Sequence, residues 1–182
     1  MDKPLSVLII EDSHGDVLLQ VLALEEAGYL VTYTVAAAAA EMKAALARQA
    51  FDIVISDHNL PQFDAPGALA VLKQSGLDIP FIIVSGAIGE EAAVALLKAG
   101  AHDYVMKDRL TRLASAVEHA LQDAEDRRAR RQAEGLLRAS EEKYRALVEN
   151  ISDVLYTLDT HGNVTYISPS VERFTEIGRA HV

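Results

Sequence analysis

Short runs of apolar, mostly β-branched residues alternate with helical patterns through the first 110 residues, and this alternation restricts the fold more than any other feature. The runs predict strands at Leu5–Ile10, Tyr29–Val35, Phe51–Ser56, Ile79–Val84 and Tyr104–Met106. The helical patterns predict helices from Ser13 to Gly28, at Ala37–Arg48, near Gly67–Gln74, at Glu90–Lys98 and from about Leu110. Strands that alternate with helices form parallel sheets covered on both faces, so we expect a doubly wound α/β fold.

Two local signals mark the first of these helices. Ser13 and Asp16 have the spacing of a capping box, in which each side chain accepts a hydrogen bond from the backbone amide of the other residue. Gly28 provides a stop signal after the last apolar position of the helix. We therefore expect the first strand to lead through a short turn directly into a helix.

The composition excludes several classes of protein. Cysteine is absent from the 182 residues, so disulfides, thiolate metal sites and a cysteine nucleophile are excluded. The net charge of −10 disfavours a long contact with phosphates, so we expect no direct nucleic acid partner. No run of about 18 apolar residues occurs, so we expect no secretion signal, no membrane span and a cytoplasmic location.

Charged and hydroxyl side chains fall where the predicted strands end. Glu11 and Asp12 follow the first strand, Asp57 the third, Ser85 the fourth and Lys107 the fifth. In a doubly wound sheet these ends meet at the ligand-binding crevice, where three converging carboxylates require a proton or a cation between them. Oxygen ligands favour Mg²⁺. Mg²⁺ held by two carboxylates, with Asp57 as a free nucleophile beside an ammonium and a hydroxyl, suits phosphoryl transfer.

This constellation closely resembles the receiver domain of bacterial two-component response regulators over roughly residues 4–122. The matching stretches are Leu8–Asp12, Ile53–Asp57 followed by Leu60-Pro61, Val84–Gly86 and Tyr104–Lys107. The resemblance implies a receiver domain at residues 1–122 with a flavodoxin-like five-stranded sheet of order 2-1-3-4-5. It also implies a function in phosphorelay signal transduction.

The resemblance assigns roles to the acidic residues. It implies that Asp57 accepts a phosphoryl group from the phosphohistidine of a cognate histidine kinase or phosphotransfer protein. It further implies that Asp12 contacts Mg²⁺ directly and that Glu11 acts largely through water. The backbone carbonyl of Asn59 would be the third protein ligand.

The resemblance also assigns a conformational switch. Ser85 would hydrogen-bond a phosphoryl oxygen, Tyr104 would swing inward behind it, and Lys107 matches the lysine of the family. Two departures stand out. Asp108 follows the lysine where receivers usually have a proline preceded by a cis peptide bond, and the loop at 58–67 has more proline and aromatic character than the commonest form.

A helical pattern continues for about 40 residues after Leu110, and we assign 123–139 to a helical signalling linker. Two apolar stripes run along this helix. The first comprises Leu110, Leu113, Val117, Ala120 and Ala124, and the second comprises Ala133, Leu137, Ser140, Tyr144 and Leu147. The stripes are offset by one position, a rotation of about 100°, with Gly135 at the change of phase.

Either a hinge at Gly135 or a coiled coil with a register skip fits this change of phase. We expect a homodimer through one or both stripes. The alternative for the first stripe is that it packs entirely on the sheet of the same chain.

From Ile151 the apolar period changes to two, and the turn residues Thr160–Asn163 precede Val164–Ile167, which predicts a β-hairpin. The helical segment before it and the hairpin resemble the start of a PAS sensor domain. We assign 140–176 to a truncated α+β PAS fragment, for which no ligand can be named. The resemblance implies a longer protein whose output module is most often a histidine kinase, less often a cyclic-dinucleotide enzyme.

The last six residues, 177–182, depart from the PAS pattern just after Thr175. With suitable codons they spell ATC GGA AGA GCA CAC GTC, which is the start of a common sequencing-library adapter. We therefore interpret these residues as a tail foreign to the natural protein.

Two other functions remain as alternatives. A phosphohydrolase would also use Asp57 as nucleophile, but that chemistry typically wants a second acid two residues later, where Asn59 lies. Asp108 and the unusual loop suggest a receiver fold that binds protein partners without phosphorylation. His119 and the arginines within 127–131 are expected to be solvated helix residues, not a phosphoacceptor and a phosphate-binding patch.

Overall fold

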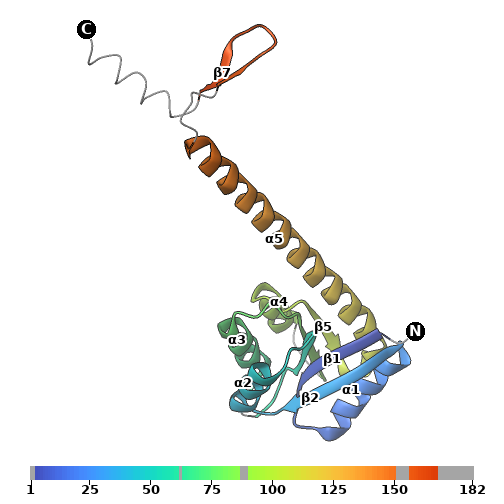
Figure 1. Ribbon diagram of the computed structural model, residues 1–182. Coiled ribbons are helices and arrows are strands. Elements are labelled where there is room, and N and C mark those ends of the chain that lie inside the picture. The colour runs from blue at the N-terminus through green and yellow to red at the C-terminus, as the bar shows by residue number, and fades with distance from the viewer. Residues whose placement is uncertain (1–2, 62, 87–89, 151–155, 168–182) are drawn as a thin grey trace, which may run out of the picture. The chain divides into compact units, whose positions relative to one another are not determined.

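The computed structural model describes residues 3–61, 63–86, 90–150 and 156–167 (Figure 1). The strands are β1 (Lys3–Ile10), β2 (Tyr29–Ala36), β3 (Ile53–Asp57), β4 (Phe81–Ser85), β5 (Asp103–Met106), β6 (Tyr156–Leu158) and β7 (Val164–Ile167). The helices are α1 (His14–Glu26), α2 (Ala39–Arg48), α3 (Ala65–Ser75), α4 (Glu90–Lys98), the 3₁₀ helix η1 (Lys107–Arg112) and α5 (Leu113–Asn150). The chain forms two compact units, residues 1–127 and 128–182.

Five strands form one parallel sheet in the order β2-β1-β3-β4-β5, which confirms the predicted doubly wound α/β fold. The register pairs Ile10 with Ser56 and Ser85 with Met106, so neighbouring strands end side by side. Residues that follow these strands therefore meet at one edge of the sheet, where ligands bind in folds of this kind.

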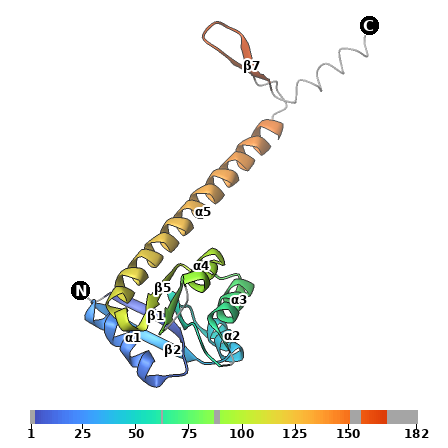
Figure 2. The same ribbon diagram turned by 180° about the vertical axis from the view of Figure 1, so that it is seen from behind.

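Helices cover both faces of the sheet (Figures 1 and 2). α1 and the first turns of α5 pack on one face, and α2, α3 and α4 pack on the other. The central strands are buried on both faces, and Val54, Ile55, Ile82 and Ile83 are completely inaccessible to solvent. Each buried branched side chain contributes about 1.5–3 kcal/mol, so these strands supply the rigid base of the site.

β2 lies at one edge of the sheet and carries no charged residue. Its eight residues pair with β1 in one uninterrupted register. Leu30, Tyr33 and Val35 are 60%, 41% and 42% exposed along this edge. The uncharged edge is thus long, regular and partly apolar.

The predicted strands and helices are present, but several bounds differ. β3 and β4 each begin two residues later and end one residue later than predicted, while α4 has the predicted bounds. Phe51 is buried without belonging to β3, and the Asp52 carboxylate after it accepts a hydrogen bond from the Ser6 amide (2.8 Å). The pattern of apolar residues alone cannot show whether a buried residue also pairs with a neighbouring strand.

The capping box at the start of α1 is only half formed. Ser13 Oγ accepts a hydrogen bond from the Asp16 amide (3.3 Å), as predicted. The reciprocal bond is replaced, because the Ser13 amide donates to Glu11 Oε1 (3.1 Å) and the Asp16 carboxylate accepts from Lys107. The prediction of a complete box was therefore wrong, and the Asp16 carboxylate belongs to the site described below.

α5 begins with the first apolar stripe packed on the sheet of its own chain. Leu113, Val117 and Ala120 are buried in the same cluster as α1, and Ala124 is 1% exposed. This is the alternative stated for the first stripe, which is thereby unavailable to a second chain. The first helix turn differs from expectation, since residues 107–112 form η1 before α5 starts.

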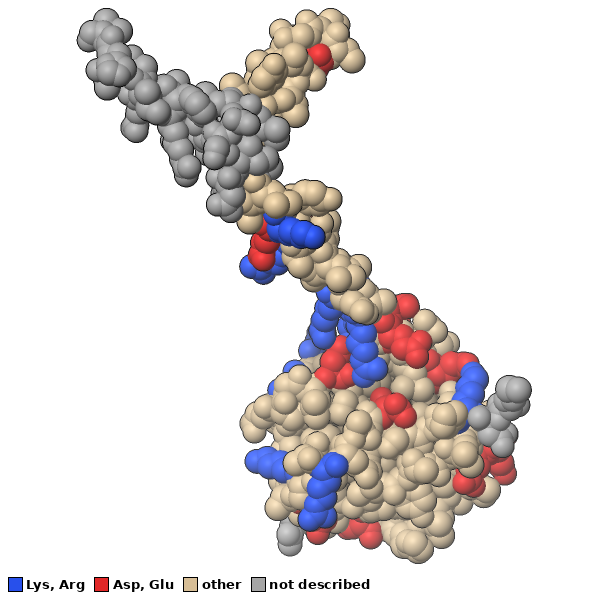
Figure 3. Space-filling view, viewed as in Figure 1, with Lys and Arg blue, Asp and Glu red and all other residues tan. Residues whose placement is uncertain are grey.

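In the second unit, α5 runs without interruption through Gly135 to Asn150. Leu137 and Tyr144 of the second stripe are 61% and 67% exposed. Charged side chains of both signs lie along this part of the helix (Figure 3), and Arg130 pairs with Glu134 at 2.8 Å. Within the described residues, no helix is both long and apolar enough to cross a membrane.

The predicted hairpin is present as the antiparallel pair β6 and β7. Its turn is held by the Asp159 carboxylate, which accepts hydrogen bonds from the amides of His161 (2.8 Å) and Asn163 (2.9 Å). The hairpin side chains, including Tyr156 and Ile167, are exposed. The remainder of the expected PAS segment, at 151–155 and 168–176, and the tail 177–182 lie outside the described residues.

Gln20 on α1 gives a test of the core. Its side chain is buried, and neither Oε1 nor Nε2 has a hydrogen-bond partner among the described residues. An unpaired buried amide costs about 1–3 kcal/mol, so Gln20→Met should raise the free energy of unfolding by about 1–2 kcal/mol in urea titrations. The control Gln132→Met, at an exposed position of α5, should change it by less than about 0.5 kcal/mol. A destabilised Gln20→Met variant would contradict this assignment.

Candidate functional site

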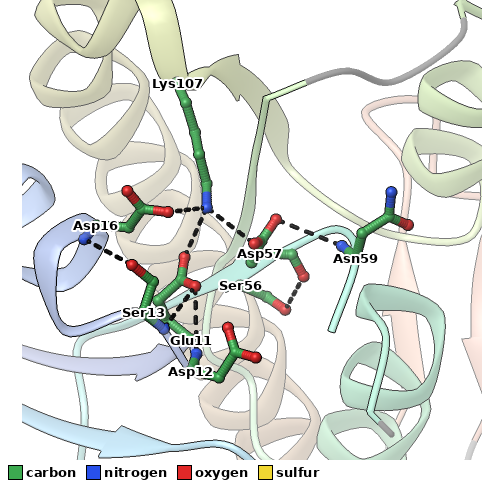
Figure 4. Close-up of polar contacts among 8 residues, drawn as sticks. All are labelled: Glu11, Asp12, Ser13, Asp16, Ser56, Asp57, Asn59 and Lys107. Carbon is green, nitrogen blue, oxygen red and sulfur yellow. Dashed lines mark hydrogen bonds and ion pairs between the residues drawn. The ribbon is translucent and has the colours of Figure 1, made fainter. Parts of the chain in front are cut away.

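The ammonium of Lys107 lies at the centre of a cluster of carboxylates at the strand ends (Figure 4). Its Nζ donates to Glu11 Oε2 at 2.9 Å, to Asp57 Oδ2 at 2.9 Å and to Asp16 Oδ2 at 2.5 Å. Glu11 follows β1, Asp57 ends β3, and Lys107 follows β5, as the sequence predicts. The parallel sheet therefore brings together residues that are 96 and 50 positions apart in the chain.

Glu11 is the most deeply buried charge of the cluster, with no exposed side-chain surface. Its Oε1 accepts hydrogen bonds from the amides of Asp12 (3.2 Å) and Ser13 (3.1 Å). Burial raises the pKa of Glu11 above its ordinary value, and the nearby Asp57 charge adds to this, while Lys107 and the Ser13 amide oppose it. Three carboxylates contact one ammonium, so the site carries more negative charge than Lys107 neutralises.

The pKa of Lys107 is also raised, which for an ammonium favours the charged form. Burial alone would lower the pKa of its ammonium, but hydrogen bonds to Asp16, Asp57 and Glu11 outweigh burial and raise the pKa above its ordinary value. Lys107 therefore stays charged at neutral pH.

Asp57 is positioned as a nucleophile would be. Its side chain is 12% exposed, Oδ2 is held by Lys107, and Oδ1 accepts a long hydrogen bond from the Asn59 amide (3.4 Å). The Ser56 hydroxyl donates to the Asp57 backbone carbonyl (3.0 Å), which fixes the main chain at the end of β3. The carboxylate is oriented from both sides and remains accessible.

Asp12 differs from the other acids of the cluster. It is exposed, it turns its carboxylate away from the ammonium (Figure 4), and that carboxylate makes no hydrogen bond to the described residues. Its backbone amide is held by Glu11, so the residue is fixed at the mouth of the site while its carboxylate is free to accept a ligand.

The donor chemistry of this site fits a hard divalent cation. Asp12, Asp57, Glu11 and the Asn59 carbonyl provide only oxygen atoms, and the surplus of negative charge favours a cation. No three acidic or histidine side chains among the described residues are arranged around a single metal position. Lys107 instead fills the space between Glu11 and Asp57.

Ser85 and Tyr104 lie beside the cluster without contacting it. Ser85 ends β4, is 2% exposed, and its hydroxyl makes no hydrogen bond to the described residues. Tyr104 on β5 is partly buried and packs against the hydrophobic core between the sheet and helices α2, α3 and α4. In the loop after β3, the buried Nδ1 of His58 has no partner among the described residues.

Asp16 is the site residue that the sequence prediction missed. Its carboxylate was assigned to the capping box, whereas it contacts Lys107. One pattern could have identified it: an acidic residue in the first turn of a helix that follows a strand ending in acidic residues. That turn borders the ends of the strands.

Comparison with known proteins identifies the family of this domain. The sequence profile of the family described as "Response regulator receiver domain" matches residues 7–118. Transcriptional regulatory protein KdpE of Staphylococcus aureus is 33% identical over 101 residues, which cover 56% of this chain and 42% of that protein. Transcriptional regulatory protein ZraR of Salmonella typhimurium is 29% identical over 64% of this chain and 26% of that protein.

Among solved structures, the receiver domain of a signal transduction histidine kinase from Syntrophus aciditrophicus superposes with a TM-score of 0.54. It is 28% identical, and the match covers 65% of this chain and 91% of that one.

The chain belongs to the response regulator receiver domain family, whose members act in two-component phosphorelay signalling. The matched part spans less than half the length of the two curated relatives.

The buried Glu11 charge predicts a pH-dependent stability. Since its pKa is raised on folding, the contribution of Glu11 to stability is fully present below its unfolded pKa of 4.5 and is lost as pH rises through the folded value. Glu11→Gln should therefore unfold at higher urea concentration than the wild type at pH 7 without divalent metal. The difference should shrink below pH 4.5.

The exposed variant Glu25→Gln on α1 is the control for this experiment and should match the wild type at both pH values. A Glu11→Gln protein that is less stable than the wild type at pH 7 would contradict the assignment of Glu11 as an unfavourably buried charge.

Proposed function

We propose that Asp57 is the phosphoacceptor of a phosphorelay. The observation that carries this proposal is the accessible Asp57 carboxylate, oriented by Lys107 and Asn59 among further acids at the strand ends. A carboxylate oxygen attacks the phosphorus of a partner's phosphohistidine, the new P–O bond replaces the P–N bond, and the imidazole leaves as its neutral form after taking a proton from solvent.

The residues around Asp57 have distinct tasks in this reaction. Lys107 donates hydrogen bonds to the phosphoryl oxygens and offsets their charge, since positioning and charge neutralisation supply most of the catalysis of phosphoryl transfer. Ser85 donates its hydroxyl to a phosphoryl oxygen, because it ends the neighbouring strand and its hydroxyl has no described partner.

Mg²⁺, when bound by Asp12, Asp57 and the Asn59 carbonyl with Glu11 acting through water, would neutralise charge on the phosphoryl group. Receiver domains generally bind this ion at the phosphorylation site. Here the oxygen-only donor set and the excess of carboxylates over the single Lys107 ammonium support it.

The phosphohistidine partner is a histidine kinase or a phosphotransfer protein. Apolar side chains are exposed beside the site, since Leu18, Leu19 and Leu22 of α1 are about half exposed. They lie two, three and six residues after Asp16, on the helix whose first turn borders Asp57. This surface suits a partner that must bring its histidine to the mouth of the site.

Phosphorylation would then be relayed through the helical linker at 123–139. Inward movement of Tyr104 toward Ser85 would change the packing of the core against α4, and α5 would transmit the change to the PAS segment 140–176. The exposed hairpin β6–β7 is consistent with the start of such a segment. The longer protein would be a cytoplasmic histidine kinase that contains this receiver.

A second candidate function is a receiver fold that binds partners without phosphorylation. Asp108, where most receivers have proline, favours it, as does the acidic cluster already neutralised in part by Lys107. The two functions differ in whether Asp57 becomes labelled.

Asp57→Asn tests the main proposal. The wild type incubated with acetyl phosphate and Mg²⁺ should form an acyl phosphate that maps to Asp57, and Asp57→Asn should lower the labelled fraction at least 20-fold because it lacks the nucleophilic carboxylate. The exposed variant Asp108→Asn should be labelled like the wild type. Labelling that survives Asp57→Asn would refute the assignment, and an unlabelled wild type would favour the binding module.

The second stripe of α5 predicts a homodimer. Leu137 is in the stripe and Leu136 is not, although both are exposed, so they form a matched pair. Light scattering at tens of micromolar should show a dimer that Leu137→Glu weakens at least tenfold and that Leu136→Glu leaves largely intact. A strictly monomeric wild type would refute dimerisation through this stripe.

A further inference from the structure

The Lys107 ammonium has no spare donor. An ammonium carries three N–H groups, and Nζ of Lys107 makes three hydrogen bonds, to Glu11, Asp57 and Asp16. A phosphoryl group on Asp57 would present three strong acceptor oxygens to the same ammonium. One of its oxygens can replace the Asp57 carboxylate, but a second hydrogen bond to the group requires that Lys107 release Glu11 or Asp16.

The two remaining carboxylates are not equally releasable. The Glu11 side chain is completely buried, so without Lys107 it would be a buried charge held only by two backbone amides. The Asp16 side chain is 34% exposed and can be hydrated where it stands. Asp16 also lies in the first turn of α1, where the helix dipole favours a negative charge. Release of Asp16 is therefore the less costly of the two.

We propose that Asp16 is a positioning residue that holds Lys107 in the unphosphorylated protein and competes with the phosphoryl group for it. The proposal rests on the proposed function of Asp57. The Asp16–Lys107 pair joins the first turn of α1 to η1, so its loss on phosphorylation removes one link between these two elements. Asp16 thus sets how tightly the site holds a phosphoryl group.

The test compares Asp16→Asn with Glu25→Gln, which removes one negative charge from an exposed position of the same helix. Beryllofluoride in saturating Mg²⁺ serves as the phosphoryl mimic, and its dissociation constant is measured from amide chemical shifts in NMR titrations. Asp16→Asn should bind the mimic at least threefold more tightly than the wild type, and Glu25→Gln should bind it within 1.5-fold. Equal or weaker binding by Asp16→Asn would overturn the proposal.

A general reduction of negative charge near the site could also tighten binding, so the same substitution is repeated in Lys107→Ala. If Asp16 acts through Lys107, the gain from Asp16→Asn disappears in that background, because the two effects are coupled. A gain of the same size in both backgrounds would assign the effect to the field of Asp16 and overturn the competition. Unfolding curves of Asp16→Asn show whether the first turn of α1 survives.

Failure of this proposal is distinguishable from failure of the proposed function. A wild type that neither binds beryllofluoride nor becomes labelled on Asp57 would refute the phosphoacceptor itself. A wild type that does both, together with an Asp16→Asn variant that behaves like Glu25→Gln, would refute only the role of Asp16.

Discussion

The attraction between one ammonium and three carboxylates is the interaction on which the site depends. The sheet topology forces Glu11 and Asp57 together, and Asp16 joins them from the first turn of α1. Like charges at this separation repel strongly in a partly buried environment, where the effective dielectric constant is well below that of water. Lys107 offsets this repulsion with three hydrogen bonds, so the three carboxylates can lie close together at the strand ends without another cation.

That balance is incomplete, because three carboxylates share one ammonium. Burial raises the pKa of Glu11 even with Lys107 bound to it. A divalent cation that binds among these carboxylates would reduce their mutual repulsion. Asp57 remains accessible beside the buried Glu11. The negative charge that Lys107 does not neutralise therefore also acts on the Asp57 carboxylate. The central strands that carry these residues are buried on both faces, which holds the arrangement in place.

The sequence was sufficient for the sheet and for most of the site. Glu11, Asp57 and Lys107 could be found because each follows a buried strand, and the ends of parallel strands must converge. Asp16 could not be found, because its spacing from Ser13 satisfies a local capping rule equally well. A long lysine side chain from η1 decides between the two interpretations, and no local pattern reports where that side chain reaches.

A similar limit applied to the helix after η1. The stripe containing Val117 has the same spacing whether it covers a sheet or a second helix, and the choice depends on whether the sheet leaves a face open. Here α1 leaves room beside it on that face, and the stripe fills it. Strand bounds shifted for a related reason, since burial and ladder pairing end at different residues, as at Phe51.

The uncharged edge strand β2 has a consequence for the behaviour of the protein at high concentration. An edge without lysine, proline or a bulge presents unpaired backbone groups to any other strand, and two copies of such an edge are complementary to each other. The net charge of −10 is then the main force keeping chains apart. Near the isoelectric point of about 5.0, or in high salt, that long-range repulsion vanishes while the edge stays unchanged. The resistance of this receiver to aggregation therefore depends on the charge of the whole chain, whereas the edge that could pair with another chain belongs to one strand, β2.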